Sequence, residues 1–248
     1  MAKDIILENR EEFKAVLEGY EISKHGKEII HDVRYVVLLG VAAGGRNTII
    51  DQLVRGGKFV QLVSDTTRPP KLRDGKMEQE GVNYYFRDEE EFLKELKAGE
   101  FLEAELIHDQ QVSGTSIREL KRIYDSGKIG INETEFGGGQ NLLKAKPDSD
   151  VFAIFPPSYD EWQRRFQSRE DISSTEFINR MNTALKIIAL CKREDRIHVI
   201  INDDFIAAAS SIDDIIHGHK ETAHEKHAID ALLNSFEQNI SKALEETR

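Results

Sequence analysis

The sequence predicts an α/β fold, a mainly parallel β-sheet with helices on both of its faces. Short apolar runs that suit buried strands alternate along the chain with stretches of helical periodicity. A glycine-rich turn joins the first of these strands to a helix, as expected where parallel strands are connected through helices. A polar and acidic segment at about 64–116 interrupts the alternation and is predicted to form an insert in this core.

The composition limits the classes of protein that fit. A chain of 248 residues suits one large domain, or one domain with an appendage. The net charge of −11 argues against a nucleic-acid backbone as the main partner. A single cysteine, Cys191, excludes an internal disulfide framework and favours a reducing compartment. Without a signal peptide or an apolar run long enough to cross a membrane, we expect a cytoplasmic protein.

Each end of the chain carries an apolar stripe at helical spacing. The stripe in residues 1–34 predicts an amphipathic helix on the flank of the domain. The stripe in residues 219–248 predicts a further helix that either packs on the body or pairs with a second copy of the chain. The stripes are Phe13, Val16, Leu17 and Tyr20, and Ile229, Leu232, Leu233, Phe236, Ile240 and Leu244.

The turn after the first predicted strand, residues 36–39, has the spacing of a phosphate-binding loop. Gly40 and Gly45 take the two glycine positions of the frame G-x-x-x-x-G-K-[ST], with Gly44 between them. Backbone N–H groups of such a turn point inward, and the following helix N-terminus adds partial positive charge. The sequence therefore predicts a phosphate site here, and a plain strand-to-helix turn is the alternative.

Two residues at the end of this loop depart from the frame. Arg46 stands in place of the lysine and keeps its charge, but on a planar guanidinium. Asn47 stands where the frame has a hydroxyl that binds Mg²⁺, and it offers an amide oxygen instead. We expect Arg46 to supply the phosphate-binding charge, with Asn47 and Thr48 as candidate Mg²⁺ ligands.

Later segments add groups that suit a phosphorylated ligand. In the sequence SDTTRPPK, residues 64–71, Arg68 and Lys71 stand beside three hydroxyls, which suits a phosphate grip or an exposed loop. Glu133 and Glu135 follow the predicted strand 128–132, at the carboxyl end where open α/β sheets bind ligands. Basic residues gather again on two helices after the predicted strand 151–155: Arg164, Arg165, Arg169 and Arg180.

Taken in order, these motifs resemble those of the guanylate kinase family over roughly residues 36–217. SDTTRPPK with the later GVNY is similar to the family's S-x-T-T-R-x-P-R and G-x-D-Y. GEFLEAE is similar to its G-E-F-L/I-E, and the run 114–116 to the end of its Y-G-T/S-S/T. The run 154–169 is similar to its I-x-P-P-S…L-x-x-R-L-x-x-R-G, and the run 201–203 to its V-x-N-D.

The resemblance implies a P-loop core over 35–218, a GMP-binding insert at about 64–116 and a helical lid at about 158–185. The activity it implies is transfer of the γ-phosphate of ATP, bound with Mg²⁺, to GMP. Carried over by position, the GMP contacts are Ser64, Arg68, Lys71, Tyr84, Glu103, Thr115, Glu133 and Glu135. The ATP and phosphate contacts are Gly40, Gly44, Gly45, Arg46, Asn47, Thr48 and Arg169, and the catalytic arginines are Arg46, Arg165 and Arg180.

Departures from the family pattern leave alternatives open. They are concentrated in the donor half, because Arg46 and Asn47 change the end of the loop. In the acceptor half, Lys71 replaces an arginine and Ser113 a tyrosine. The sequence thus fits a GMP kinase, a kinase with another acceptor nucleotide, or a catalytically weak or inactive scaffold module that binds GMP or a phosphorylated partner. The retained arginines favour the enzyme.

Overall fold

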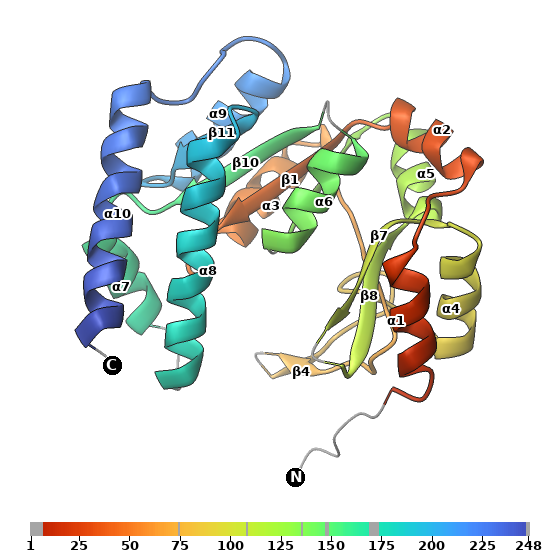
Figure 1. The fold of residues 1–248 in the computed structure, drawn as a ribbon. Helices are drawn as coiled ribbons and strands as arrows, with labels where there is room; N and C mark the ends of the chain where they lie inside the picture. The colour runs from red at the N-terminus through yellow and green to blue at the C-terminus, as the bar shows by residue number, and fades with distance from the viewer. Residues whose placement is uncertain are drawn as a thin grey trace. The chain divides into compact units, whose positions relative to one another are not determined.

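The structure is a computed structural model that describes residues 7–73, 75–107, 109–134, 136–146, 149–168 and 174–246. The chain divides into two compact units (Figure 1). None of the described helices is both long and apolar enough to cross a membrane. Unit 1 comprises Met1–Arg34, Val60–Gly130 and Lys144–Pro147, and unit 2 comprises Tyr35–Phe59, Ile131–Leu143 and Asp148–Arg248.

The larger sheet is five-stranded, in the order β11-β10-β1-β9-β2. β10 pairs in parallel with β1 on one side and with β11 on the other, so that Val151 lies opposite both Val37 and Ile197. This confirms the predicted α/β class. The strands are β1 Tyr35–Gly40, β2 Phe59–Gln61, β9 Ile129–Glu133, β10 Asp150–Phe155 and β11 Ile197–Ile201.

Helices cover both faces of this sheet in unit 2. α3 and α9 pack on each other behind β1 in the view of Figure 1, and α8 lies in front of it with α10 alongside. All six residues of β1 are buried, as expected for a parallel strand covered on both faces. The helices are α3 Arg46–Arg55, α6 Phe136–Ala145, α7 Tyr159–Gln167, α8 Ser174–Arg193, α9 Phe205–Ile216 and α10 Lys226–Glu246.

Unit 1 is built on a mixed four-stranded sheet in the order β6-β3-β8-β7. β3 pairs in parallel with β6, and β8 runs antiparallel to both β3 and β7. A separate hairpin joins β4 to β5. The strands are β3 Asp65–Thr66, β4 Leu72–Arg73, β5 Lys76–Met77, β6 Tyr85–Phe86, β7 Phe101–Ile107 and β8 Gln111–Ser116, and the helices are α1 Arg10–Glu18, α2 Lys24–Asp32, α4 Glu89–Lys97 and α5 Ile117–Asp125.

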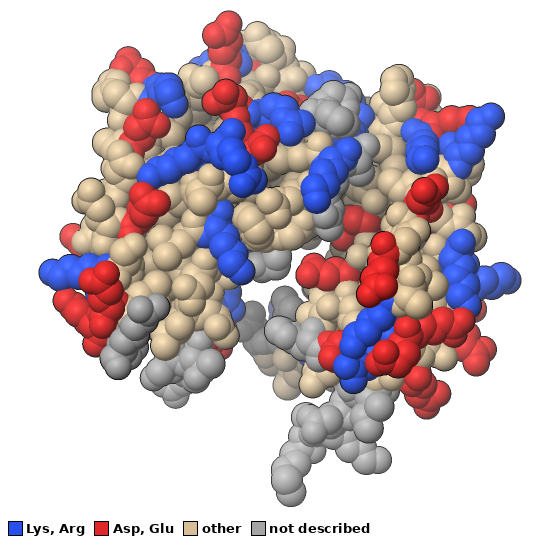
Figure 2. Space-filling model, in the orientation of Figure 1, with Lys and Arg blue, Asp and Glu red and all other residues tan. Residues whose placement is uncertain are grey.

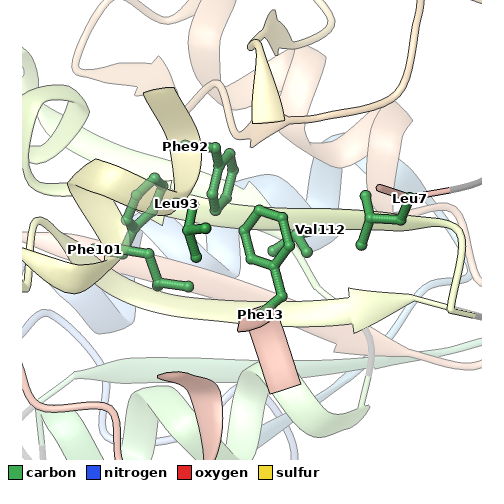
Figure 3. Close-up of a cluster of buried hydrophobic side chains, with 7 residues drawn as sticks. Leu7, Phe13, Phe92, Leu93, Phe101 and Val112 are labelled. Atoms are coloured by element: carbon green, nitrogen blue, oxygen red, sulfur yellow. The ribbon is translucent and has the colours of Figure 1, made fainter. Parts of the chain in front are cut away.

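The N-terminal helix α1 contributes to the core of unit 1. Phe13, fully buried, meets Phe92 of α4 edge-on with ring centroids 6.0 Å apart, and Phe92 stacks on Phe101 at 4.5 Å. Figure 3 shows these rings with Leu7, Leu93 and Val112 in one cluster. The first segment of the chain therefore packs with the insert through apolar contacts, the main favourable term in folding.

Two helices go beyond the elements predicted from sequence. Ser23 is the N-cap of α2, and its hydroxyl accepts from the Gly26 backbone N–H. The helix packs against α5. α6 contains a run of three glycines that disfavours helix formation, and Gly139 in it is in close contact with Leu39 of β1. Asp88 is the N-cap of α4, where its carboxylate accepts from the backbone N–H groups of Glu90 and Glu91.

Candidate functional site

The loop between β1 and α3 needs glycine at both fixed positions of the phosphate-binding frame. A Cβ atom on Gly40 would lie 2.5 Å from the backbone oxygen of Ile154. Gly45 is the N-cap of α3 with a φ of +94°, and a Cβ there would lie 2.3 Å from Nδ2 of Asn202. The backbone contact at Gly40 and the left-handed φ of Gly45 both favour glycine, which explains the spacing seen in the sequence.

Two buried side chains hold backbone carbonyls of this loop. Trp162 of α7 donates its indole N–H to the oxygen of Ala42 over 2.6 Å. Asn202, after β11, donates its amide to the oxygen of Gly44 over 2.8 Å. In a trans peptide the N–H points opposite to the C=O, so the N–H groups of Ala43 and Gly45 point away from these anchors. Oriented N–H groups of this kind form an anion-binding turn.

A cleft of about 320 Å³ opens beside the loop within unit 2. It contains three loop and helix residues, the predicted catalytic Arg165, and polar groups from the segment after β11. The run 201–203 was predicted only as a family motif, without a role, and no role was predicted for Trp162. The cleft is lined by Ala43, Gly45, Thr48, Arg165, Ser168, Asn202, Asp203 and Phe205.

Arg46 is held by the end of β9. Its Nε lies 3.3 Å from a carboxylate oxygen of Glu133, and one Nη donates to the backbone oxygen of Thr134 over 2.9 Å. With the Asn47 amide nitrogen facing Glu133, it donates to the two carboxylate oxygens at 3.2 and 2.7 Å. Glu133, which the resemblance places among the GMP contacts, thus contacts the two variant residues of the loop. Glu135 lies outside the described residues.

The other predicted arginines of unit 2 occupy different surroundings. Arg165, in the cleft, donates to Glu161, and the hydrogen bonds from Arg164 and Arg165 lower the pKa of Glu161 to about 2. Glu161 is therefore charged at neutral pH. Arg180 donates to Glu176 one turn earlier on α8, beside a small pocket formed by aromatic side chains rather than in the cleft. Arg169 lies outside the described residues.

In unit 1, the predicted phosphate grip is centred on a buried ion pair. Both Nη atoms of Arg68 donate to Glu78, over 2.5 and 3.0 Å, and the guanidinium lies over the Tyr84 ring at 4.7 Å. Lys71 is exposed, and its backbone N–H also donates to Glu78 over 2.9 Å. Arg68 therefore lies beside Lys71 and Tyr84, the two residues predicted to bind phosphate with it, and Glu78 is a further member of the cluster that the sequence did not reveal.

The predicted guanine contacts of unit 1 lie on the small sheet. Glu103 and Thr115 are register partners on β7 and β8, and Thr115 hydrogen-bonds to the Glu103 carboxylate. Burial raises the pKa of Glu103 above its ordinary value, and the Thr115 hydrogen bonds oppose that rise. Ser64 is half-buried just before β3, and its backbone oxygen accepts from the Tyr85 N–H.

The distribution of charged and metal-binding side chains bears on how the protein could hold a cation. Figure 2 shows Asp and Glu side chains mixed with Lys and Arg over the visible face. Among the residues that the structure describes, no group of three or more His, Cys, Asp or Glu side chains is arranged to hold a metal ion. A cation here would therefore rely on few protein ligands, as Mg²⁺ bound with a nucleotide does.

The glycine-rich loop follows a central parallel strand at its carboxyl end and lies beside a cleft, and two of its carbonyls are bound by buried side chains. This arrangement defines a P-loop nucleotide-binding protein. A family profile described as guanylate kinase matches residues 32–219, about three quarters of the chain. The chain belongs to the guanylate kinase family, a family of nucleoside monophosphate kinases.

Individual relatives give the same result. The chain is 32% identical over 187 residues to a guanylate kinase of Corynebacterium glutamicum, covering 75% of this chain and 95% of that protein. It is 34% identical over 185 residues to one of Synechococcus, covering 74% and 82%. A crystal structure of guanylate kinase from Anaplasma phagocytophilum matches with a TM-score of 0.54 and 25% identity, covering 84% of this chain and 98% of that one.

Proposed function

We propose that this protein transfers the γ-phosphate of ATP to GMP, giving ADP and GDP. The observation that carries the proposal is the loop between β1 and α3, whose carbonyls at Ala42 and Gly44 are held by Trp162 and Asn202 beside the 320 Å³ cleft. Phosphoryl transfer needs little covalent chemistry from the protein, and it depends on positioning and on positive charge around the moving group.

The donor phosphates are assigned to the loop of unit 2. Backbone N–H groups of Ala43 and Gly45 and the N-terminus of α3 would bind the anion. Arg46 would supply the charge that a lysine supplies in the usual frame, and Arg165 would neutralise the moving phosphoryl group. We infer that Glu133 positions Arg46 and Asn47, because it contacts both, in place of the GMP contact that the resemblance implies.

The residues of the loop fit an Mg²⁺ ion bound with ATP. Thr48 lines the cleft with a hydroxyl, and the oxygen of Asn47 is turned away from Glu133 when the amide nitrogen faces that carboxylate. Both are hard oxygen ligands of the kind that Mg²⁺ accepts alongside water and phosphate oxygens. When bound, the ion would neutralise negative charge on the transferred phosphate.

The acceptor is assigned to unit 1. An ionised Glu103 accepts from both N1–H and the 2-amino group of guanine, a donor pair that adenine lacks, and Thr115 holds the carboxylate in place. Lys71 and Tyr84 would bind the GMP phosphate, beside Arg68, whose guanidinium lies over the Tyr84 ring and is paired with Glu78. We place this activity in the cytoplasm, and Cys191, whose pKa is raised to about 12 by burial, suits a reducing compartment.

The test is ADP formation from MgATP by the purified protein with GMP, dGMP, AMP, UMP and CMP as acceptors. Calorimetric titration with GMP runs in parallel. We expect turnover with GMP that exceeds turnover with AMP by at least about a hundredfold, because the Glu103 carboxylate rejects a base without the donor pair. GMP binding without turnover would instead make the protein a binding module, and turnover with AMP or a pyrimidine nucleotide would refute the assignment of Glu103.

A further inference from the structure

The C-terminal helix α10 lies beyond the region shared with the family. The family profile ends at residue 219, and α10 spans Lys226–Glu246. Its apolar face packs against α7 and α8, which is the first of the two alternatives left open by the sequence. Lys192 of α8 reinforces this packing by donating to Asn234 and Glu237, over 2.8 and 2.6 Å.

One residue of α10 joins an aromatic cluster that reaches the phosphate loop. Phe236, fully buried, contacts the rings of Phe155, Tyr159 and Trp162 at centroid distances of 5.5, 6.0 and 5.6 Å. Trp162 is 2% exposed, and its indole N–H is the group that binds the oxygen of Ala42. A continuous chain of contacts thus runs from α10 through Trp162 to the loop.

The loop needs such a support. Ala43, which follows the anchored carbonyl, has a φ of +60°, a left-handed conformation that is strained for a residue with a Cβ. Strained backbone of this kind persists only where the surroundings fix it. The indole of Trp162 fixes the peptide just before Ala43, and the position of that indole depends on the rings around it.

We propose that α10 is a positioning element of the donor site, and that Phe236 and Trp162 act as positioning residues for the phosphate loop. The proposal rests on the donor role proposed for this loop. Neither residue touches the nucleotide. Phe236 sets the position of the indole, and the indole holds the Ala42–Ala43 peptide so that its N–H points toward the bound phosphate.

The kinetic test compares three variants. Trp162→Phe keeps a ring but loses the N–H, and Phe236→Ala loses the support under the indole. Each is expected to raise the KM for MgATP about fivefold, the effect of one net hydrogen bond, and to change the KM for GMP by less than about twofold. Leu233→Ala is the matched control, a truncation at an equally buried position one turn earlier on α10.

Thermal unfolding separates positioning from a general loss of stability. Phe236→Ala and Leu233→Ala should both lower the Tm, since each leaves a cavity under the same helix. Only Phe236→Ala should raise the KM for MgATP. Equal KM values for MgATP in the two variants, or equal rises in the KM for GMP and MgATP, would overturn the proposal.

A binding test keeps this inference separate from the proposed activity. Trp162 is the single tryptophan of the sequence, so intrinsic fluorescence reports on this position alone. Titration of the wild-type protein with MgATP should change the emission, and in Phe236→Ala the midpoint should move to about fivefold higher concentration. The shift in the midpoint is expected even if no GDP is formed. In that case the assignment as a kinase fails and the positioning role of α10 stands. An emission that does not respond, or an unchanged midpoint, would refute the coupling.

Discussion

Each unit contains an arginine expected to bind phosphate, and in each unit a glutamate already contacts it. In unit 1, the side chains of Arg68 and Glu78 are 3% and 1% exposed, and the two Nη atoms make a bidentate contact. In unit 2, those of Arg46 and Glu133 are 13% and 39% exposed, and they meet through Nε at 3.3 Å. The first pair has the features of a structural pair and the second those of an adjustable one.

The difference follows from how far each ion pair is removed from solvent. Charges taken out of water are expensive, and a buried pair is tolerable only when each partner satisfies the other. Arg68 and Glu78 therefore depend on each other for the fold of unit 1. Glu133 remains partly in water, so it offsets the charge of Arg46 without locking it, and a nucleotide phosphate can compete for the guanidinium.

Breaking the buried pair should have the largest effect. Glu78→Gln leaves the Arg68 guanidinium buried without its counter-charge, and we expect the free energy of unfolding to fall by about 3–5 kcal/mol. Urea unfolding measures this. The control is Asp125→Asn, which removes an exposed partner of Lys121 and should change stability by less than about 1 kcal/mol. Similar losses in the two variants would show that the Arg68–Glu78 pair is not structural.

Removing the second arginine should spare the fold and affect the reaction. Arg46→Ala takes away the main positive side chain of the loop, so kcat should fall by about a hundredfold or more while the affinity for GMP stays within about twofold. Steady-state kinetics and GMP calorimetry measure the two quantities.

Glu133→Gln distinguishes the two roles considered for Glu133, contact with the loop and contact with GMP. A higher KM for MgATP would support the contact of Glu133 with the loop, and a higher KM for GMP would support the GMP contact implied by the resemblance.

The smallest expected effect is a dependence of GMP binding on pH. Burial raises the pKa of Glu103, so the carboxylate protonates at a higher pH than an ordinary glutamate. Only the ionised form accepts from both guanine donors, and GMP affinity should therefore fall as the pH falls through this raised pKa. Calorimetry from about pH 5 to about pH 8 should show the fall in wild type.

Glu103→Gln is the control for that profile. It should bind GMP about tenfold more weakly at neutral pH, because one acceptor becomes a donor facing a donor, and its affinity should vary little with pH. For the stability of the protein without GMP, the effect of pH has the opposite direction to its effect on GMP affinity. A raised folded-state pKa contributes stability at low pH that is lost as the pH rises through it, so the glutamine variant should unfold no more easily than wild type at neutral pH. A pH profile shared by both proteins would exclude Glu103 as its source.

Periodicity and glycine spacing were enough to predict the core of the fold. The apolar run before Gly40, the spacing to Gly45 and the later apolar runs predict the strands of the larger sheet, because burial on both faces demands continuous apolar sequence. α6 was not predicted, since its glycine run disfavours a helix and only the close approach of Gly139 to Leu39 explains it. α2 carries its apolar residues too sparsely to be recognised without its partner α5.

The sequence indicated which residue types belong to the candidate site, but not which side chains contact one another there. Arg68, Lys71 and Tyr84 are neighbours as expected, and Glu103 does lie beside Thr115. Glu78 was not predicted at all, and Glu133 was predicted without its contact to Arg46, because the sequence does not show which side chains meet in space. Trp162 and Asn202 were missed for a different reason: each acts on backbone carbonyls of the loop, which leave no mark in the sequence of the loop itself.

The most direct test of the account is GDP formation at saturating GMP as MgATP is increased. A working loop built on Arg46 and Asn47 predicts a rate that rises with MgATP, saturates, and is lost in Arg46→Ala. Calorimetry must show that wild type and variant both bind GMP. Tight GMP binding with no GDP at any MgATP concentration would contradict the account, because it would mean that Glu133 holds Arg46 too firmly for the loop to serve as a donor site.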